Sequence, residues 1–283
     1  MIKIGDNMKK QITTIIIFLI SLVAIIATIT LATIKSNQNK KQEISQEFEK
    51  VSYYDKTKEK RYINYQKKNK NLSIEDIVMN VNIGLDKPYY TNTKPAKNLN
   101  TNLILVNKYH YLTKSYVPNN LVPINHDYAR SGMSLVKEAK EAFEKLSQDA
   151  KQDNMMIFAI SSYRSYDYQL NLYNTYVAAD GKKAADTYSA RAGFSEHQTG
   201  LVVDVYDGIT PYTSFEETKE FKWMQENSHK YGFILRYPKD KVKITGYQYE
   251  SWHYRYVGKK IAKIIKEANL SLEEYYVKEV ENH

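Results

Sequence analysis

The longest apolar segment of the chain runs from Ile12 to Ile34 and contains no charged residue, with lysines at positions 9, 10 and 35 on its two sides. At about 1.5 Å per residue, a helix of this length crosses the ~30 Å hydrocarbon core of a bilayer. A signal peptide usually has a shorter apolar core followed by a small-residue cleavage site, and no convincing site follows Ile34. We therefore expect an uncleaved transmembrane anchor over 12–34, preceded by a short cytoplasmic segment, 1–11.

The next segment, 35–71, is polar and lysine-rich and contains few aliphatic residues. A segment of this kind buries little apolar surface, so we expect an extended or partly helical stalk. Ser73, followed by Glu75 and Asp76, then predicts a short capped helix. We expect the stretch 72–102 to form an N-terminal extension that packs on the following domain.

Apolar and polar positions from 103 onward predict one domain, 103–283, in which a few strands alternate with helices. The helices are expected over 134–147, 167–178, 222–231 and 257–268, and the strands over 103–107, 155–160, 201–205 and 232–237. We expect a proline-containing loop over 116–123 and a polar loop or lid over 180–193. Because no strand–helix–strand pattern is repeated, these elements favour an α+β fold over a doubly wound one.

Composition narrows the classes of function. The chain has 283 residues, a net charge of +9 and no cysteine, so an attached lipoprotein anchor is excluded. Its lysines are scattered and no nucleic-acid-binding module is present, which disfavours nucleic acid as a partner. The positive charge is equally compatible with genome bias or with a surface beside anionic envelope polymers.

One stretch, Ser195 to Asp204, carries the first half of a candidate metal site. His197 and Asp204 stand seven positions apart, with Gly200 between them. Glycine permits a tight bend or a close backbone approach, so His197 can come from a loop and Asp204 from the strand that follows. A buried carboxylate needs a partner, and a cation is one such partner.

The second half lies near the C-terminus, where Glu250 and His253 stand three positions apart beside Trp252. In an ideal strand Glu250 and His253 would point to opposite faces, so we expect a bend or bulge between them. Trp252 either forms an apolar wall of the site or fills the core, and its bulk favours the core with one edge exposed.

Two imidazoles and one carboxylate are the protein ligands that a catalytic zinc ion uses, with a fourth position left for water. We assign His197, Asp204 and His253 as ligands, which leaves Glu250 as general base and then general acid. Each of these residues alone would more often be a core or surface residue, and only their combination favours a metal site. A set of two histidines and an aspartate favours zinc over other divalent ions.

Arg164 follows the strand expected over 155–160, next to Tyr163. Its guanidinium suits a substrate carboxylate or a developing oxyanion. Without the other motifs, a surface arginine in a loop would be the better interpretation.

Three motifs together resemble a known family. Ser-Ser-Tyr-Arg-Ser at 161–165, Ala-Arg-Ala-Gly-Phe-Ser-Glu-His-Gln-Thr-Gly-Leu-Val-Val-Asp at 190–204 and Glu-Ser-Trp-His at 250–253 resemble the signature motifs of the VanY-type D-alanyl-D-alanine carboxypeptidases. These enzymes belong to the LAS group of zinc peptidases, and the resemblance covers roughly Leu103 to Leu270. Two departures are Ala192, where many relatives have proline, and Val202, where the family has alanine.

The resemblance implies a small antiparallel sheet with flanking helices and zinc in a groove. It implies zinc on His197, Asp204 and His253, Glu250 as the base, and Arg164 as the group that binds and polarises the substrate. Substrate-binding residues expected on this basis or from their position beside the motifs are Arg164, Ser195, Gln169, Tyr163 and Trp252.

The implied function is removal of the C-terminal D-alanine from peptidoglycan stem peptides by zinc-activated water. A cell-wall substrate places the catalytic domain outside the membrane, which makes this a single-pass membrane protein. Within the same family the alternatives are an L,D-carboxypeptidase or an endopeptidase. Outside enzymes, the alternatives are a catalytically idle peptidoglycan-binding module and a membrane-tethered basic scaffold.

Overall fold

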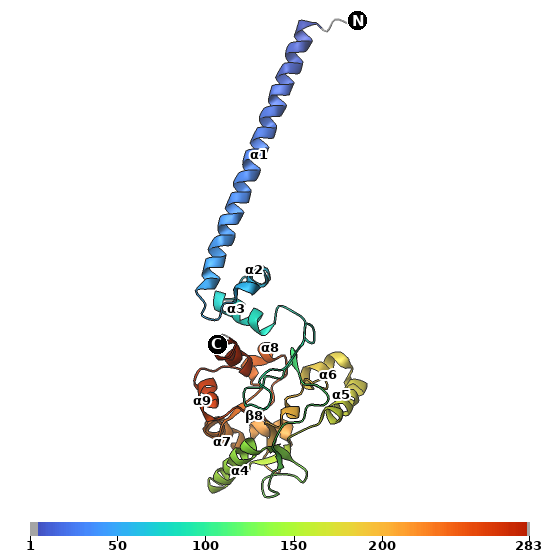
Figure 1. Ribbon diagram of the computed structural model, residues 1–283, viewed down its shortest axis with the longest axis vertical. Coiled ribbons are helices and arrows are strands. Elements are labelled where there is room, and N and C mark those ends of the chain that lie inside the picture. The colour runs from blue at the N-terminus through green and yellow to red at the C-terminus, as the bar shows by residue number, and fades with distance from the viewer. Residues whose placement is uncertain (1–4, 282–283) are drawn as a thin grey trace. The chain divides into compact units, whose positions relative to one another are not determined.

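The computed structural model describes residues 5–281, and its contacts divide the chain into two compact units, Met1–Val78 and Met79–His283. More than half of the first unit is one long helix, α1 (Asp6–Glu49) (Figure 1). It is followed by η1 (Lys56–Lys58), α2 (Glu59–Lys68) and α3 (Ile74–Ile83), the last of which continues into the second unit. As expected, Ser73 caps α3: its Oγ accepts a hydrogen bond of 3.0 Å from the Asp76 N–H.

The apolar segment 12–34 lies within α1, and its large apolar side chains are exposed. Hydroxyl side chains of this segment donate to carbonyl oxygens four residues earlier, as Ser21 does to Ile17 at 2.8 Å, so their polarity is satisfied within the helix. By length and composition α1 can cross a membrane, with a mean hydropathy of 3.0 in its most apolar stretch. A signal sequence near an N-terminus has the same properties. The structure therefore contains one candidate membrane span among its described residues.

Part of the polar segment 35–71 is folded around aromatic side chains. Phe48 and Tyr62 are fully buried, with ring centroids 5.5 Å apart, and the ring of Tyr54 lies at the same distance from that of Tyr62. Aromatic rings bury a large area each, so a segment poor in aliphatic residues can still form a small core.

The second unit is built on a four-stranded antiparallel sheet with the strand order β5-β6-β8-β7. Its strands are β5 (Phe158–Ser161), β6 (Val202–Tyr206), β8 (His253–Tyr256) and β7 (Phe233–Leu235). Two smaller sheets accompany it: β1 (Lys94–Pro95) pairs in parallel with β2 (His110–Tyr111), and β3 (Leu121–Pro123) pairs antiparallel with β4 (Ser134–Val136). The small antiparallel sheet expected for an α+β fold is present.

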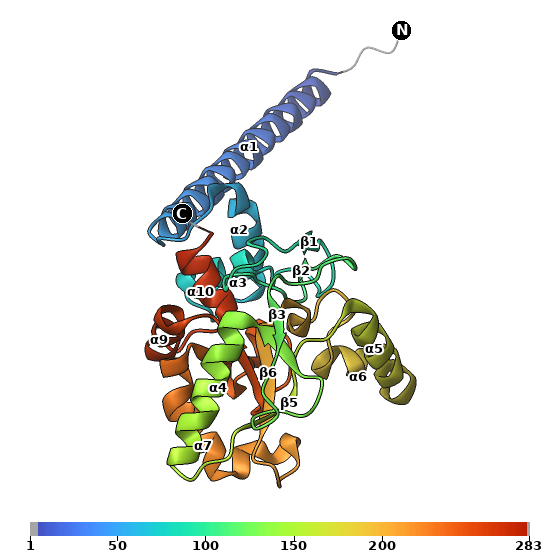
Figure 2. The same cartoon turned by 60° about the horizontal axis from the view of Figure 1, so that its bottom comes forward.

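Helices surround this sheet, and α5 and α6 lie side by side (Figure 2). The α-helices of the second unit are α4 (Lys137–Gln152), α5 (Tyr166–Asp180), α6 (Lys182–Tyr188), α7 (Lys219–Asn227), α8 (Val242–Thr245), α9 (Lys259–Glu267) and α10 (Leu272–Glu279). Short 3-10 helices are η2 (Glu196–Thr199), η3 (Tyr212–Glu217), η4 (Ser228–Tyr231) and η5 (Lys239–Lys241). The four helices expected from periodicity correspond to α4, α5, α7 and α9, with ends shifted by a few residues. The start expected at Ser134 is wrong, because 134–136 form β4.

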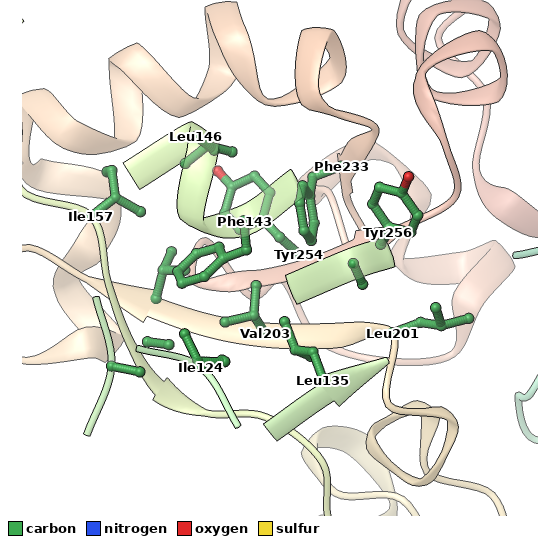
Figure 3. Close-up of a cluster of buried hydrophobic side chains, with 14 of the residues drawn as sticks. Ile124, Leu135, Phe143, Leu146, Ile157, Leu201, Val203, Phe233, Tyr254 and Tyr256 are labelled. Atoms are coloured by element: carbon green, nitrogen blue, oxygen red, sulfur yellow. The ribbon is translucent and has the colours of Figure 1, made fainter. Parts of the chain in front are cut away.

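The main core lies between α4 and one face of the sheet. Phe143 and Leu146 of α4 are fully buried and face Val203 and Tyr254 of the sheet (Figure 3). Successive side chains of a strand point to opposite faces, so the burial of Val203 against α4 turns Asp204 to the other face. The apolar packing of β6 therefore aims this carboxylate away from the core.

The expectation of a strand over 103–107 is wrong. Ile104, Leu105 and Val106 are buried, but the segment joins no sheet beyond an isolated bridge between Asn107 and His110. Instead, the Arg255 guanidinium donates to the carbonyl of Ile104 at 2.7 Å. An apolar run can satisfy its backbone with a buried side chain as well as with a neighbouring strand, and sequence periodicity does not distinguish the two.

Two expected loops contain regular structure. Residues 121–123, within the loop expected over 116–123, form β3, and residues 182–188, within the expected lid over 180–193, form α6. Pro123 lies in a strand of a two-stranded sheet, which is an edge strand, and proline is tolerated there.

Candidate metal centre and substrate cleft

A cleft of about 790 Å³ lies on the face of the sheet that Asp204 points to. Nearly all of the residues singled out from the sequence line it: Arg164, Gln169, Ser195, His197, Asp204, Glu250, Trp252 and His253. Tyr163 does not line the cleft, and its backbone N–H donates to the Ser134 carbonyl at 3.1 Å. Segments almost ninety residues apart in the sequence therefore meet in one hollow.

His197 is held by the short helix η2 and by the glycine that ends it. Gly200 has a φ of +68° in the left-handed region, and its N–H donates to the His197 carbonyl. A Cβ at this position would lie 3.1 Å from both Pro118 Cγ and Val136 Cγ2. The sequence predicted that Gly200 permits a tight bend or a close backbone approach. The structure has both.

Asp204 and His253 are direct partners across the antiparallel pair β6 and β8. Directly opposed residues have Cβ atoms about 5 Å apart, so two donors on one face of a pair are natural metal ligands. The bend expected between Glu250 and His253 is a turn, in which the His253 N–H points back to the Glu250 carbonyl at 3.4 Å. This turn brings Glu250 to the same side as His253, with Glu250 Oε2 3.3 Å from His253 Nδ1.

One ligand atom from each of His197, Asp204 and His253 lies within 4.8 Å of the others, and all three residues are buried. His197 Nε2 is 3.4 Å from Asp204 Oδ2, and His253 Nδ1 is 3.1 Å from Asp204 Oδ1. Among the described residues, His197 Nε2 and Asp204 Oδ1 have no hydrogen-bond partner. Buried polar atoms without partners that converge on one point fit a metal ion, and this donor set suits zinc.

The charges of the site favour cation binding. Burial and the nearby Arg164 lower the pKa of His197 to about 3, so its imidazole is neutral and able to donate a lone pair. Burial raises the pKa of Asp204, but the two histidines outweigh it and hold that pKa well below its usual range. For His253, burial is outweighed by the neighbouring carboxylates, which raise its pKa to about 9. Metal binding at this histidine therefore releases a proton.

Glu250 differs from Asp204 although both are buried carboxylates. Burial is the largest influence and raises the pKa of Glu250 to about 7, with the charge of Asp204 acting in the same direction. A carboxylate with a pKa near neutrality can accept a proton and release it again at physiological pH.

Arg164 is fixed by its neighbours at the edge of the metal centre. Its Nη1 donates to Gln169 Oε1 at 3.0 Å, its Nη2 to Asp204 Oδ2 at 3.4 Å, and its backbone N–H to the His197 carbonyl. Gln169 is buried and is itself held by the Ala190 carbonyl at 2.8 Å. Gln169 therefore holds the Arg164 guanidinium in a fixed orientation.

Trp252 packs on the main core and also lines the cleft, where its ring meets that of Tyr212 edge to face at 5.1 Å. Both functions considered for this tryptophan are thus combined. Ser195, directly before η2, is buried in the floor of the cleft.

One group near the centre was missed by sequence reasoning. Glu196 is buried between two fully buried arginines, Arg236 and Arg255, and its carboxylate approaches His253. Two features of the sequence could have indicated this group. An acidic residue stands directly before a candidate ligand, and two arginines stand inside strongly apolar or aromatic stretches. A buried charge needs a buried partner, and which partner it finds depends on the fold.

Comparisons with known proteins agree with this geometry. Residues 132–259 match the family model VanY, described as D-alanyl-D-alanine carboxypeptidase. YodJ of Bacillus subtilis (strain 168) is 39% identical over 212 residues, which are 70% of this chain and 78% of that protein.

Solved structures extend the comparison to the fold. An LdcB LD-carboxypeptidase superposes with a TM-score of 0.62 at 39% identity, covering 66% of this chain and 91% of the other. A mutant of the vancomycin-resistance D,D-pentapeptidase VanY, in complex with Zn(II), superposes with a TM-score of 0.52 at 35% identity, covering 62% and 98%. The second unit therefore has the fold of the VanY-type zinc peptidases.

Proposed function

The chain belongs to the VanY family of D-alanyl-D-alanine carboxypeptidases, and from this premise we propose that it hydrolyses the C-terminal D-alanine from peptidoglycan stem peptides. It is a zinc metallopeptidase. One observation carries the proposal: three buried candidate ligands converge in one cleft, with a carboxylate of raised pKa beside them.

In this proposal His197, Asp204 and His253 hold the zinc ion. The chemistry that a bound zinc ion supplies is activation of water and stabilisation of negative charge on the substrate carbonyl oxygen. The chain provides the three metal-binding side chains on a short helix and two paired strands. Their mutual geometry is therefore fixed before a metal ion or a substrate enters.

Glu250 is the proton carrier. It takes a proton from the attacking water as the water oxygen bonds to the carbonyl carbon, and it gives a proton to the amine nitrogen as the C–N bond breaks. A pKa of about 7 suits both steps, because the same group must be deprotonated first and protonated afterwards.

Arg164 binds and polarises the substrate. Arg130 also lines the cleft, so the cleft offers two guanidinium groups to a peptide that carries carboxylates. Stem peptides are such substrates. The tyrosine and tryptophan side chains along the cleft offer apolar contact for the remainder of the peptide.

A second candidate is L,D-carboxypeptidase activity. The observation that favours it is the superposition on an LD-carboxypeptidase with a TM-score of 0.62 and 39% identity. Both candidates use the same metal centre and differ in the residue that precedes the released alanine.

For the whole chain we propose a membrane-bound arrangement with 1–11 cytoplasmic, 12–34 as the anchor, 35–71 as a spacer, 72–102 as an extension and 103–283 as the extracytoplasmic catalytic domain. Support comes from the apolar helix and from the site of the substrate, which is outside the membrane.

The test uses the full chain in detergent, loaded with zinc and incubated separately with muropeptides ending in D-Ala-D-Ala and with tetrapeptides ending in one D-Ala. Mass spectrometry follows alanine release. Loss from the pentapeptide alone identifies a D,D-enzyme, and loss from the tetrapeptide an L,D-enzyme. No release from either substrate, with zinc bound, would overturn the carboxypeptidase proposal in favour of an endopeptidase or a binding module.

Glu250→Ala serves as the catalytic control. It removes the proton carrier without removing a ligand, so zinc should stay bound while turnover falls by about 10²-fold to 10⁴-fold. The exposed Glu217 lies outside the cleft, and Glu217→Ala should leave turnover unchanged. Near-normal turnover in Glu250→Ala would show that another group carries the proton.

A further inference from the structure

We propose that Glu196 is the positioning residue for His253, and that it holds this imidazole with the proton on Nε2 and the Nδ1 lone pair directed at the metal. The inference rests on the proposed function to the extent that His253 is a zinc ligand. Glu196 touches neither the substrate nor the metal in this account and acts through the histidine alone.

The first observation is how Glu196 is held. Its Oε1 accepts hydrogen bonds from Arg236 Nε at 2.9 Å and from Arg255 Nη1 at 2.8 Å. All three side chains are fully buried. Two guanidinium groups that donate to one oxygen pair with a charged carboxylate.

The second observation is that the buried cluster has one unused acceptor. Both oxygens of Glu273 accept from Arg236, at 2.6 and 2.9 Å, and one of them also accepts from Asn107. Arg255 uses its remaining donors on backbone carbonyls. Of the carboxylate oxygens in this cluster, Glu196 Oε2 alone has no hydrogen-bond partner among the described residues.

The third observation is what faces that oxygen. His253 Nε2 is also buried without a partner among the described residues and lies 3.8 Å from Glu196 Oε2. The opposite ring nitrogen, Nδ1, lies 3.1 Å from Asp204 Oδ1. The ring of Tyr237 packs against the imidazole at 4.7 Å between centroids and limits its rotation.

These contacts select one tautomer. A neutral imidazole carries one N–H and one lone pair, and a carboxylate can only accept. Asp204 and Glu250 also face Nδ1, at 3.1 and 3.3 Å, but with a metal ion bound Nδ1 must present its lone pair, and Glu196 then accepts from the N–H on Nε2. The lone pair is then on Nδ1, which faces the other candidate ligands. His197 is arranged in the opposite sense: its Nδ1 lies 2.6 Å from the Ser162 carbonyl, which also only accepts, and its Nε2 faces the site.

The partner also acts on the strength of the ligand. A carboxylate that accepts the second N–H of a ligating histidine fixes the ring and raises its basicity toward the metal. Burying that charge is unfavourable unless it is paired, which accounts for the two arginines behind it.

The test compares two variants of the full chain in detergent. Glu196→Gln keeps the size of the side chain but presents an amide that can donate to His253 Nε2, which favours the wrong tautomer. Glu273→Gln is the matched control, because it removes the same charge from the same arginine without facing His253. Zinc affinity, measured by chelator competition, should fall about 10-fold to 100-fold in Glu196→Gln and remain near the wild-type value in Glu273→Gln.

Equal losses in the two variants would overturn the proposal, because they would reflect a general loosening of the buried cluster. Unchanged affinity in Glu196→Gln would overturn it as well. If the wild-type chain itself binds no zinc, the metal centre of the proposed function fails, and that outcome is separate from a failure of Glu196 alone.

A second measurement uses the wild-type chain, so it does not depend on whether a variant at position 196 folds. In the zinc-loaded wild-type chain labelled with ¹⁵N-histidine, the ring nitrogen shifts report which nitrogen of His253 is protonated, with His253→Gln used to assign its signals among the six histidines. We expect the proton on Nε2 and the metal on Nδ1. The reverse assignment would refute the role of Glu196 whatever the activity of the enzyme.

Discussion

At the residue scale, the site depends on polar side chains that are each held by one or two specific partners. Gln169 holds Arg164, the Ser162 carbonyl faces His197, and the turn from Glu250 positions His253. A side chain with a single well-placed partner loses its function when that partner or its own geometry changes, even if its charge is kept.

Arg164→Lys tests this for the substrate-binding arginine. Lysine keeps the charge but cannot reproduce the planar fork that contacts Gln169 and Asp204 together. We expect kcat/KM to fall about 10²-fold, while zinc affinity is retained. Arg191→Lys is the control, because Arg191 pairs with Asp186 and does not line the cleft. Full activity in Arg164→Lys would mean that charge alone suffices.

His110 gives the second unit a pH-dependent stability. Burial, together with the charges of Lys94 and Lys97, lowers the pKa of His110 to about 4. An unfolded histidine titrates near 6.5, so between pH 6.5 and 4 the unfolded chain binds more protons than the folded one. The contribution of His110 to the free energy of unfolding is therefore complete above pH 6.5. It is lost as the pH falls to 4, and the whole loss is about 3 kcal/mol.

Urea unfolding of the wild-type chain and of His110→Gln at pH 7 and pH 4.5 measures this contribution. The variant should lose less stability on acidification than the wild type. The same replacement of the exposed His126 serves as the control. Parallel loss in wild type and His110→Gln would exclude the histidine as a source.

At the scale of elements, the turn between η2 and β6 connects the first two candidate ligands. Gly200 ends η2, and β6 begins two residues later at Val202. The backbone at Gly200 therefore decides both where η2 presents His197 and in which register Asp204 enters the sheet.

Gly200→Ala should destabilise the protein and weaken zinc binding. A left-handed conformation costs a residue with a Cβ about 1–2 kcal/mol, and here the Cβ also crowds Pro118 and Val136 at 3.1 Å. Gly132→Ala is the matched control, because Gly132 has a φ of +82° but no neighbour within 4 Å. Thermal unfolding should show a larger loss at position 200. Equal losses would mean that backbone strain alone matters and that the close packing does not.

At the scale of the whole molecule, the chain joins a helix rich in exposed apolar side chains to a unit that carries polar chemistry. Exposed aliphatic side chains over several turns are unfavourable in water, so this helix needs a non-aqueous environment or removal.

We expect the mature protein to keep residues 1–34 and to stay with the membrane fraction after carbonate extraction. Intact mass measured on protein purified from membranes tests retention of the segment. Protease added to cells after removal of the wall should degrade the second unit and leave the helix, because we expect the catalytic domain outside. A mass that lacks the first helix would identify a signal sequence, and protection of the second unit would reverse the topology.

The sequence by itself determined the candidate metal centre and the class of fold, because both depend on local patterns of residues. The candidate ligands lie within two short motifs, and glycine, β-branched residues and helical periodicity act over a few residues. The amphipathic pattern of α4 and the apolar run of β6 were sufficient to predict a helix and a strand at these places.

Only the tertiary structure decided which buried groups pair with one another. Arg255 satisfies the backbone of the segment expected to be a strand, and it shares Glu196 with Arg236, nineteen residues away in the chain. Hydrogen bonds and ion pairs inside a protein are specific in direction and distance, whereas sequence patterns report burial and periodicity alone. The partner of His253 therefore became visible only when the strands brought these side chains together.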